Sequence, residues 1–134
     1  TNRARSFIFT TGLPPSCAAA AAKAIEICMR EPERAANLLQ RARKIGEDLR
    51  EAGLNIPHID SQILPIMIGD SRETVKAPEN LLRRNIYVAA IRPPTVPTNT
   101  ARLRLSLMAS HEKNHIEKLL TELPSCLEEA RRDS

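Results

Sequence analysis

The sequence predicts a mixed α/β (α+β) protein in which a small sheet is covered on one face by helices. Two observations carry this prediction. Beyond residue 62, short apolar runs and amphipathic stretches follow one another in the order β-α-β-β-α. Residues 101–107 then alternate strictly, with Arg102, Arg104 and Ser106 between apolar neighbours. A strand of this kind buries one face and leaves the other face polar.

The N-terminal part, residues 1–53, is predicted to hold one strand and two helices. Residues 6–11 form a β-prone run. Ser16 is predicted to cap an alanine-rich helix that ends at Pro32, and the many alanines indicate packing on more than one side. A second amphipathic helix follows and ends at Gly53.

Residues 54–134 are predicted to form a separate C-terminal α/β domain. Two helices are expected on one face of its sheet. The expected elements are a strand at 63–68, a helix with a capping box at 70–73 and Pro78 inside it, strands at 86–91 and 101–107, and a last helix capped by Ser110 and broken at Pro124.

Composition excludes several classes of partner. The net charge is +4, and the charges are interleaved along predicted helices, which is typical of solvated faces. Aromatic residues make up only 2% of the chain, so it offers no stacking platform for nucleic acid. No run of eighteen apolar residues exists, so no membrane partner is expected. The 3 cysteines have no CxxC spacing, which indicates reduced thiols and a cytoplasmic location.

An HExxH motif occurs at residues 111–115 and is typical of zinc proteases. In those enzymes two histidines one helical turn apart bind the metal and the glutamate activates its water. Here the motif lies at the exposed start of the last helix, and little chain follows to supply a third ligand. We therefore predict a solvated helix N-terminus, in which Glu112 favours the positive end of the helix dipole, and no metal site.

The arginines near the alternating strand are the strongest functional signal. Arg102 and Arg104 project from one face of the strand, and a guanidinium group matches two oxygens of a carboxylate or phosphate. Arg92 precedes Pro93-Pro94 in a stiff loop. Each arginine also has a simpler interpretation, as an exposed residue of a hairpin loop or of a half-exposed strand.

Three segments of the chain resemble the α-oxoamine synthases. They are Arg5-Ser-Phe-Ile-Phe-Thr-Thr-Gly-Leu-Pro-Pro15, Ile91-Arg-Pro-Pro-Thr-Val-Pro97 and the strand that contains Arg-Leu-Arg. This family belongs to the fold-type I enzymes that use pyridoxal 5'-phosphate (PLP). The resemblance covers nearly the whole chain and corresponds to the C-terminal third of those enzymes. It implies the small C-terminal domain of a fold-type I transferase, preceded by the end of the large domain. The loop is most similar to that of the family's biotin-pathway branch.

The resemblance implies a homodimeric acyltransferase that condenses L-alanine with pimeloyl-CoA or a pimeloyl carrier protein, losing CO2. In that reaction the cofactor performs the difficult chemistry and the protein supplies orientation and charge. Arg104 matches the family arginine that binds the amino-acid carboxylate. Arg92 and Thr95 match the loop that closes over the substrate. Thr10 and Thr11 match the strand end whose hydroxyl groups reach the cofactor phosphate of the other subunit.

The family's cofactor-binding lysine and the residues that contact the pyridine ring would lie upstream of residue 6, so no catalytic residue is expected in this chain. We therefore expect a C-terminal portion that is inactive alone. A second interpretation remains open: a stand-alone α/β module that binds a small anion or has a regulatory role, without catalysis. A compact, well-packed monomer would favour that module.

Overall fold

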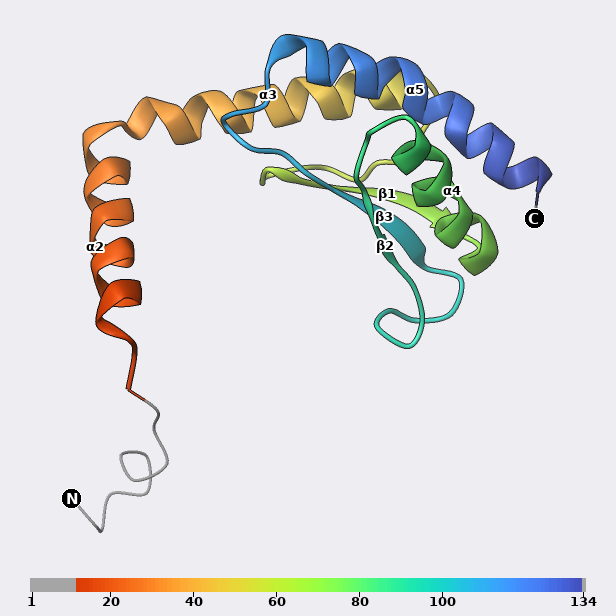
Figure 1. The fold of residues 1–134 in the computed structure, drawn as a ribbon. Helices are drawn as coiled ribbons and strands as arrows, with labels where there is room; N and C mark the ends of the chain where they lie inside the picture. Colours follow the sequence, from red (N-terminus) through yellow and green to blue (C-terminus); the bar gives the residue numbers. More distant parts are fainter. Residues whose placement is uncertain (1–11, 134) are drawn as a thin grey trace, which may run out of the picture. The chain divides into compact units, whose positions relative to one another are not determined.

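The computed structural model describes residues 12–133, which form helices α2 to α5 and strands β1 to β3 (Figure 1). The predicted strand at residues 6–11 lies outside this part. The chain divides between Ala35 and Ala36 into two compact units. The predicted boundary after residue 53 refers to the domains of a longer enzyme and stays a prediction. None of the described helices has an apolar stretch long enough to span a membrane.

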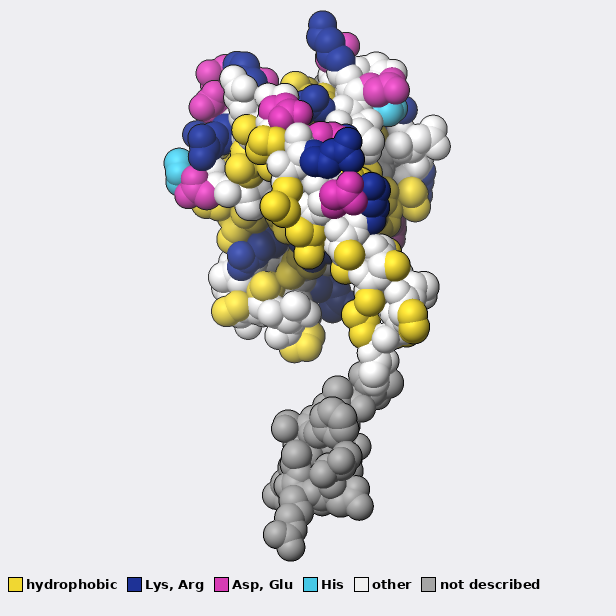
Figure 2. Space-filling view, turned by 90° about the vertical axis from the view of Figure 1, so that its left-hand side faces the viewer, with side chains coloured by type: hydrophobic (Ala, Val, Ile, Leu, Met, Phe, Trp, Pro, Cys, Tyr) yellow, Lys and Arg dark blue, Asp and Glu magenta, His cyan; other side chains and the backbone are white. Residues whose placement is uncertain are grey.

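Helix α2, Pro15–Arg30, lies in the N-terminal unit, and none of its side chains is buried by the described residues. Its N-cap is Pro14 and not the predicted Ser16. A proline at the first helical position has the fixed φ that a helix needs and no N–H to satisfy, so the helix starts earlier. Ile25 is 61% exposed and Met29 is 78% exposed. Figure 2 shows apolar side chains along this helix. The expected packing of the helix on several sides stays a prediction.

Helix α3, Pro32–Glu51, crosses the division between the units. Its buried residues are Ala42, Ile45, Gly46 and Leu49. Gly46 allows a close approach, because a Cβ at this position would lie 2.6 Å from Ile59 Cδ1. The helix ends before Gly53, which has a left-handed φ of 86° that glycine adopts without strain. The predicted helix and its C-terminal glycine are confirmed.

The sheet consists of β1 (Ile63–Gly69), β3 (Ala101–Ser106) and β2 (Ala89–Ile91), and β3 is the central strand. Both pairings are antiparallel. The strand predicted at 86–91 is shorter in the structure. Asn85 has a left-handed φ of 59° where the preceding helix closes, and the chain joins the sheet only at the first residue of β2. The other two predicted strands are confirmed.

Helix α4, Ser71–Arg83, is capped as predicted by Asp70. The Asp70 carboxylate accepts the N–H groups of Arg72 at 2.8 Å and Glu73 at 2.9 Å. Glu73 does not complete the predicted capping box. Its carboxylate accepts a hydrogen bond from Arg131 Nε at 2.8 Å, so it links α4 to the last helix.

Helix α5, Lys113–Arg132, continues through Pro124, where the prediction ended it. A proline inside a helix costs about 3 kcal/mol relative to alanine. Burial of several apolar side chains on one face, at about 1.5–3 kcal/mol for each large one, outweighs this cost. The buried residues are Leu119, Leu123, Cys126, Leu127 and Ala130. The N-cap is Glu112 and not the predicted Ser110, because Glu112 and His115 form a capping box of their own.

The core lies between one face of the sheet and the helices. Leu64 is paired with Leu105 and Ile66 with Leu103 in the register of β1 and β3, and all four side chains are buried. Residues of α3, α4 and α5 complete this core (Figure 1). The mixed α/β class is confirmed, and the C-terminal half of α3 joins the two predicted covering helices. The opposite face of the sheet therefore carries the arginines.

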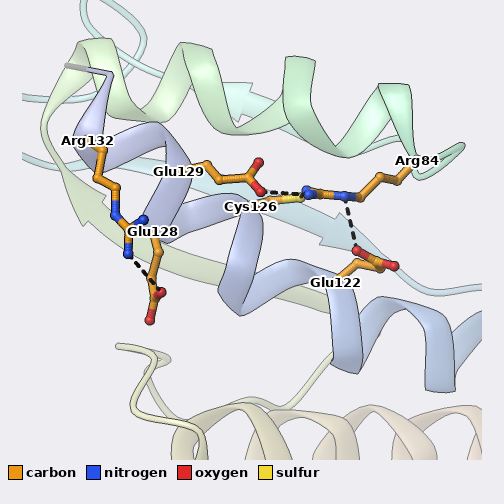
Figure 3. Close-up of polar contacts among 6 residues, drawn as sticks. All are labelled: Arg84, Glu122, Cys126, Glu128, Glu129 and Arg132. Carbon is orange, nitrogen blue, oxygen red and sulfur yellow. Dashed lines mark hydrogen bonds and ion pairs between the residues drawn. The ribbon is translucent and has the colours of Figure 1, made fainter.

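Arg84, which follows α4, links this helix to α5 (Figure 3). Its Nε lies 3.1 Å from Glu122 Oε2, and its Nη2 donates to Glu129 Oε1 at 2.7 Å. Its Nη1 donates to Sγ of the buried Cys126. The hydrogen bond from Arg84 lowers the pKa of the Glu129 carboxyl, whereas burial raises the pKa of the Cys126 thiol. At neutral pH a charged carboxylate and a neutral thiol thus share one guanidinium group.

Replacing Leu103 with alanine should lower the free energy of unfolding by about 2–5 kcal/mol, because the side chain is fully buried and leaves a cavity. Urea unfolding measures this difference. The matched control is S106A, at an exposed position on the opposite face of the same strand, where a change within about 0.5 kcal/mol is expected. Equal effects of the two substitutions would contradict the assignment of the buried face.

Replacing Glu129 with glutamine should destabilise the fold at neutral pH and have less effect as the pH falls. A carboxyl whose folded-state pKa lies below its ordinary value of 4.5 stabilises the fold above that pH. The contribution is lost as the pH drops through the folded-state value. Urea unfolding from about pH 7 to about pH 3 measures the difference. In the control E128Q, which loses only a 4.0 Å contact with Arg132, the difference should be small throughout. A pH-independent effect of E129Q would refute this account.

Candidate anion-binding site

The open face of the sheet is built around the central strand β3. Arg104 lies opposite Pro65 of β1 and Ala89 of β2, and Arg102 lies opposite Met67 and Ile91. These four neighbours carry no charge. The strand alternation that buries the leucines therefore places both guanidinium groups on an apolar surface, without a cross-strand carboxylate.

A cleft of about 500 Å³ lies on this face. It contains both strand arginines and is otherwise lined by apolar and hydroxyl side chains. Its lining residues are Ser61, Ile63, Pro65, Ile91, Thr95, Val96, Arg102 and Arg104. None of these residues is acidic, so the cleft carries two positive charges and favours a negatively charged ligand.

The two arginines of the cleft differ in how they are held. Arg102 is half-buried, and its Nε donates to the main-chain oxygen of Thr100 at 3.0 Å. Arg104 is exposed, and within residues 12–133 it has neither a hydrogen-bond partner nor an ion-pair partner. Five N–H groups of a guanidinium are available to bind oxygen atoms. Arg104 is therefore free to bind a ligand carboxylate at two points.

The structure places Thr95, a predicted substrate-binding residue, in the same cleft as Arg104. Thr95 lies in the loop between β2 and β3, and its N–H donates to the main-chain oxygen of Arg92 at 3.0 Å. Further along the loop, Thr100 donates its N–H and its hydroxyl to the Pro97 oxygen, at 3.2 and 2.7 Å. These turns hold the loop against the end of β3.

Arg92 does not lie in this cleft. It lines a second cavity of about 570 Å³ next to α4, together with Arg72, Lys76, Glu79 and other residues. Its Nη1 donates to the Pro93 oxygen at 3.3 Å. The three predicted substrate-binding residues are thus only partly assembled: Thr95 and Arg104 share a cleft, and Arg92 faces elsewhere.

The histidines of the HExxH motif accept main-chain hydrogen bonds at the start of α5. Nδ1 of His111 accepts the N–H of Met108 at 3.2 Å, and Nδ1 of His115 accepts the N–H of Glu112 at 3.1 Å. Glu112 is the N-cap of α5, two residues after the predicted cap at Ser110. Among residues 12–133, no three His, Cys, Asp or Glu side chains come together in a way that could hold a metal ion.

All 5 lysines of the chain lie in the described part: Lys23, Lys44, Lys76, Lys113 and Lys118. None of them lines the cleft. The predicted cofactor-binding residues, Thr10 and Thr11, lie outside the described residues. The described part of the site can therefore bind an anion but supplies no amine for covalent chemistry.

Arg102 was predicted to face the same side as Arg104, but it was not among the substrate-binding residues that the family resemblance implied. Its spacing of two residues from Arg104 placed it on the same face, so the signal was present in the sequence. The sequence does not reveal its half-buried state or its hydrogen bond to Thr100, which depend on the path of the preceding loop.

Comparisons with known proteins agree with this architecture. The family model described as "Aminotransferase class I and II" matches residues 1–123. The 8-amino-7-oxononanoate synthase of Methylobacterium nodulans is 43% identical over 119 residues, which cover 89% of this chain and 30% of that protein. The enzyme of the same name from Methylorubrum extorquens is 44% identical over 119 residues, with the same coverage. The chain thus spans about a third of the length of these relatives.

Solved structures show the same fold. Serine palmitoyltransferase of Sphingomonas wittichii matches with a TM-score of 0.82 and 30% identity, over 92% of this chain and 32% of that chain. The 8-amino-7-oxononanoate synthase of Francisella tularensis matches with a TM-score of 0.74 and 25% identity, over 97% of this chain and 37% of that one. The resemblance on which the sequence interpretation relied is confirmed. The chain belongs to the aminotransferase class I and II family.

Proposed function

We propose that this chain is the C-terminal part of a PLP-dependent 8-amino-7-oxononanoate synthase, an acyltransferase of biotin biosynthesis. The enzyme would join L-alanine to a pimeloyl thioester, carried on CoA or on a carrier protein, with loss of CO2 and release of the thiol. The observation that carries the proposal is the guanidinium of Arg104, which has no partner among the described residues and lies in a cleft with two cations and no acidic lining residue. The names of the relatives support the reaction.

Arg104 would bind the carboxylate of alanine. Two parallel N–H···O bonds fix both the position and the plane of a carboxylate. A fixed carboxylate in turn orients the α-carbon, whose bonds are made and broken in the reaction. Apolar residues, among them Ile63 and Pro65, line the cleft beside Arg104.

Thr95 and Arg92 would belong to the loop that covers the substrate. The position of Thr95 in the cleft supports this role for its hydroxyl group. Arg92 lines the neighbouring cavity, so its role in substrate binding requires the loop between β2 and β3 to turn it toward the cleft. Both roles are part of the proposal.

The described residues can bind the carboxylate of the substrate, but they lack the lysine that would hold the cofactor in such a site. A serine palmitoyltransferase structure that holds PLP resembles this chain with a TM-score of 0.84 and 30% identity. PLP, when bound, stabilises the negative charge that develops on the amino acid's α-carbon. No lysine lines the cleft, so a lysine from another part of the enzyme would hold the cofactor. Thr10 and Thr11 are proposed to contact its phosphate across a homodimer interface, in a cytoplasmic enzyme.

Replacing Arg104 with lysine in the whole enzyme should lower kcat/KM for alanine by about 5- to 160-fold, equivalent to about 1–3 kcal/mol, because a lysine cannot bind a carboxylate at two points. Steady-state kinetics with varied alanine measures the effect. R83K, at an exposed position at the end of α4, is the matched control and should leave the kinetics unchanged. Wild-type kinetics for R104K would rule out its role in carboxylate binding.

The 134-residue chain alone should form no specific covalent adduct with PLP, because none of its lysines lies in the cleft. Borohydride reduction of the mixture, followed by peptide mass spectrometry, locates any modified lysine. The whole enzyme serves as the control and should give one predominant modified lysine. A single predominant site within the 134-residue chain would contradict the expectation that this chain supplies no catalytic lysine.

A further inference from the structure

Arg102 occupies the same cleft as Arg104 but has no part in binding alanine in the function proposed above. The two Cα atoms are two residues apart on one strand, which corresponds to about 6.5–7 Å. Both side chains leave the same face of the sheet and line one cleft. One amino-acid carboxylate is bound by one guanidinium group, so the guanidinium of Arg102 remains available when Arg104 binds alanine.

The charges of the cleft indicate a ligand with two anionic groups. Two like charges on a partly apolar surface repel one another unless each is neutralised. Among the described residues neither Arg102 nor Arg104 has a carboxylate partner. The second cavity differs, because Arg92, Arg72 and Lys76 share it with Glu79 and Asp133, and Lys76 is paired with Glu79 at 3.2 Å.

Arg102 is held in place before any ligand arrives. Its side chain is half-buried, and its Nε is engaged by the Thr100 oxygen at 3.0 Å. The two terminal nitrogens have no partner among the described residues. A guanidinium fixed through one nitrogen loses less conformational entropy when the others bind a carboxylate.

We propose that Arg102 binds the distal carboxylate of the acyl thioester and so selects a dicarboxylic acyl group over a fatty one. The inference rests on the proposed function, since a pimeloyl group carries a thioester at one end and a carboxylate at the other. Ile91, the cross-strand partner of Arg102, and Val96 in the same cleft supply apolar surface for the methylene chain between the two ends. Arg104 and Arg102 thereby bind one anionic group from each substrate.

The test compares two acyl thioesters of equal chain length in the whole enzyme. The ratio of kcat/KM for pimeloyl-CoA to that for heptanoyl-CoA, which lacks the distal carboxylate, is measured at saturating alanine. In R102L this ratio should fall by roughly 10- to 100-fold, because a hydrogen-bonded charge pair is lost. The KM for alanine should stay unchanged. S106A, on the same face of β3 but outside the cleft, should leave the ratio at its wild-type value.

The ratio is insensitive to partial misfolding, because a loss of active enzyme lowers both rates equally. A second measurement does not depend on turnover: pimelate should protect the wild-type enzyme against thermal unfolding more than heptanoate does, and R102L should abolish that difference. An unchanged ratio in R102L, or equal protection by both acids in the wild type, would overturn the inference.

The result that would refute the proposed function differs from the result that would refute the role of Arg102. A wild-type enzyme that does not turn over pimeloyl-CoA with alanine would refute that function. If the same enzyme still prefers pimelate over heptanoate through Arg102, the dicarboxylate site stands. If it shows no such preference, both proposals fall.

Discussion

Burial of the central strand's leucines is the constraint on which the rest of the structure depends. Leu103 and Leu105 pack beneath three helices, and strand geometry then sends Arg102 and Arg104 to the opposite face. The same burial of leucines that stabilises the domain therefore also fixes the direction of the guanidinium groups. Since β3 is flanked on both sides by other strands, its backbone is fixed more firmly than that of an edge strand.

The parts of the fold that follow from the periodicity of apolar residues could be predicted. Those that depend on competition between alternative caps, or between a proline and apolar burial, could not. The strand alternation located Arg104 and its face correctly. The cap at Ser110 failed because Glu112 and His115 form a better-matched pair two residues later. Pro124 did not break α5, because its cost is local whereas the buried face of the helix is continuous. Sequence patterns describe the conformational preference of each residue but not the total free energy of a helix or strand.

The same distinction applies to the candidate site. Arg104 and Thr95 were predicted as substrate-binding residues, and the structure places both in one cleft. The direction of Arg92 could not be predicted, since loop residues follow no period and their orientation depends on the turns that close the loop. The anchoring of Arg102 to Thr100 is likewise a property of the loop's path. The described chain thus carries a surface suited to binding an anion.

The alternation of side chains on the two faces of β3 also limits which insertions and deletions this strand can tolerate during evolution. Substitutions on this strand affect either the core or the cleft, because the two sets of side chains alternate. Deleting or inserting one residue would exchange the sets, placing guanidinium groups in the core and leucines in the cleft. Only changes of length by two residues preserve both faces. The length of this strand is therefore expected to vary less than its amino-acid composition.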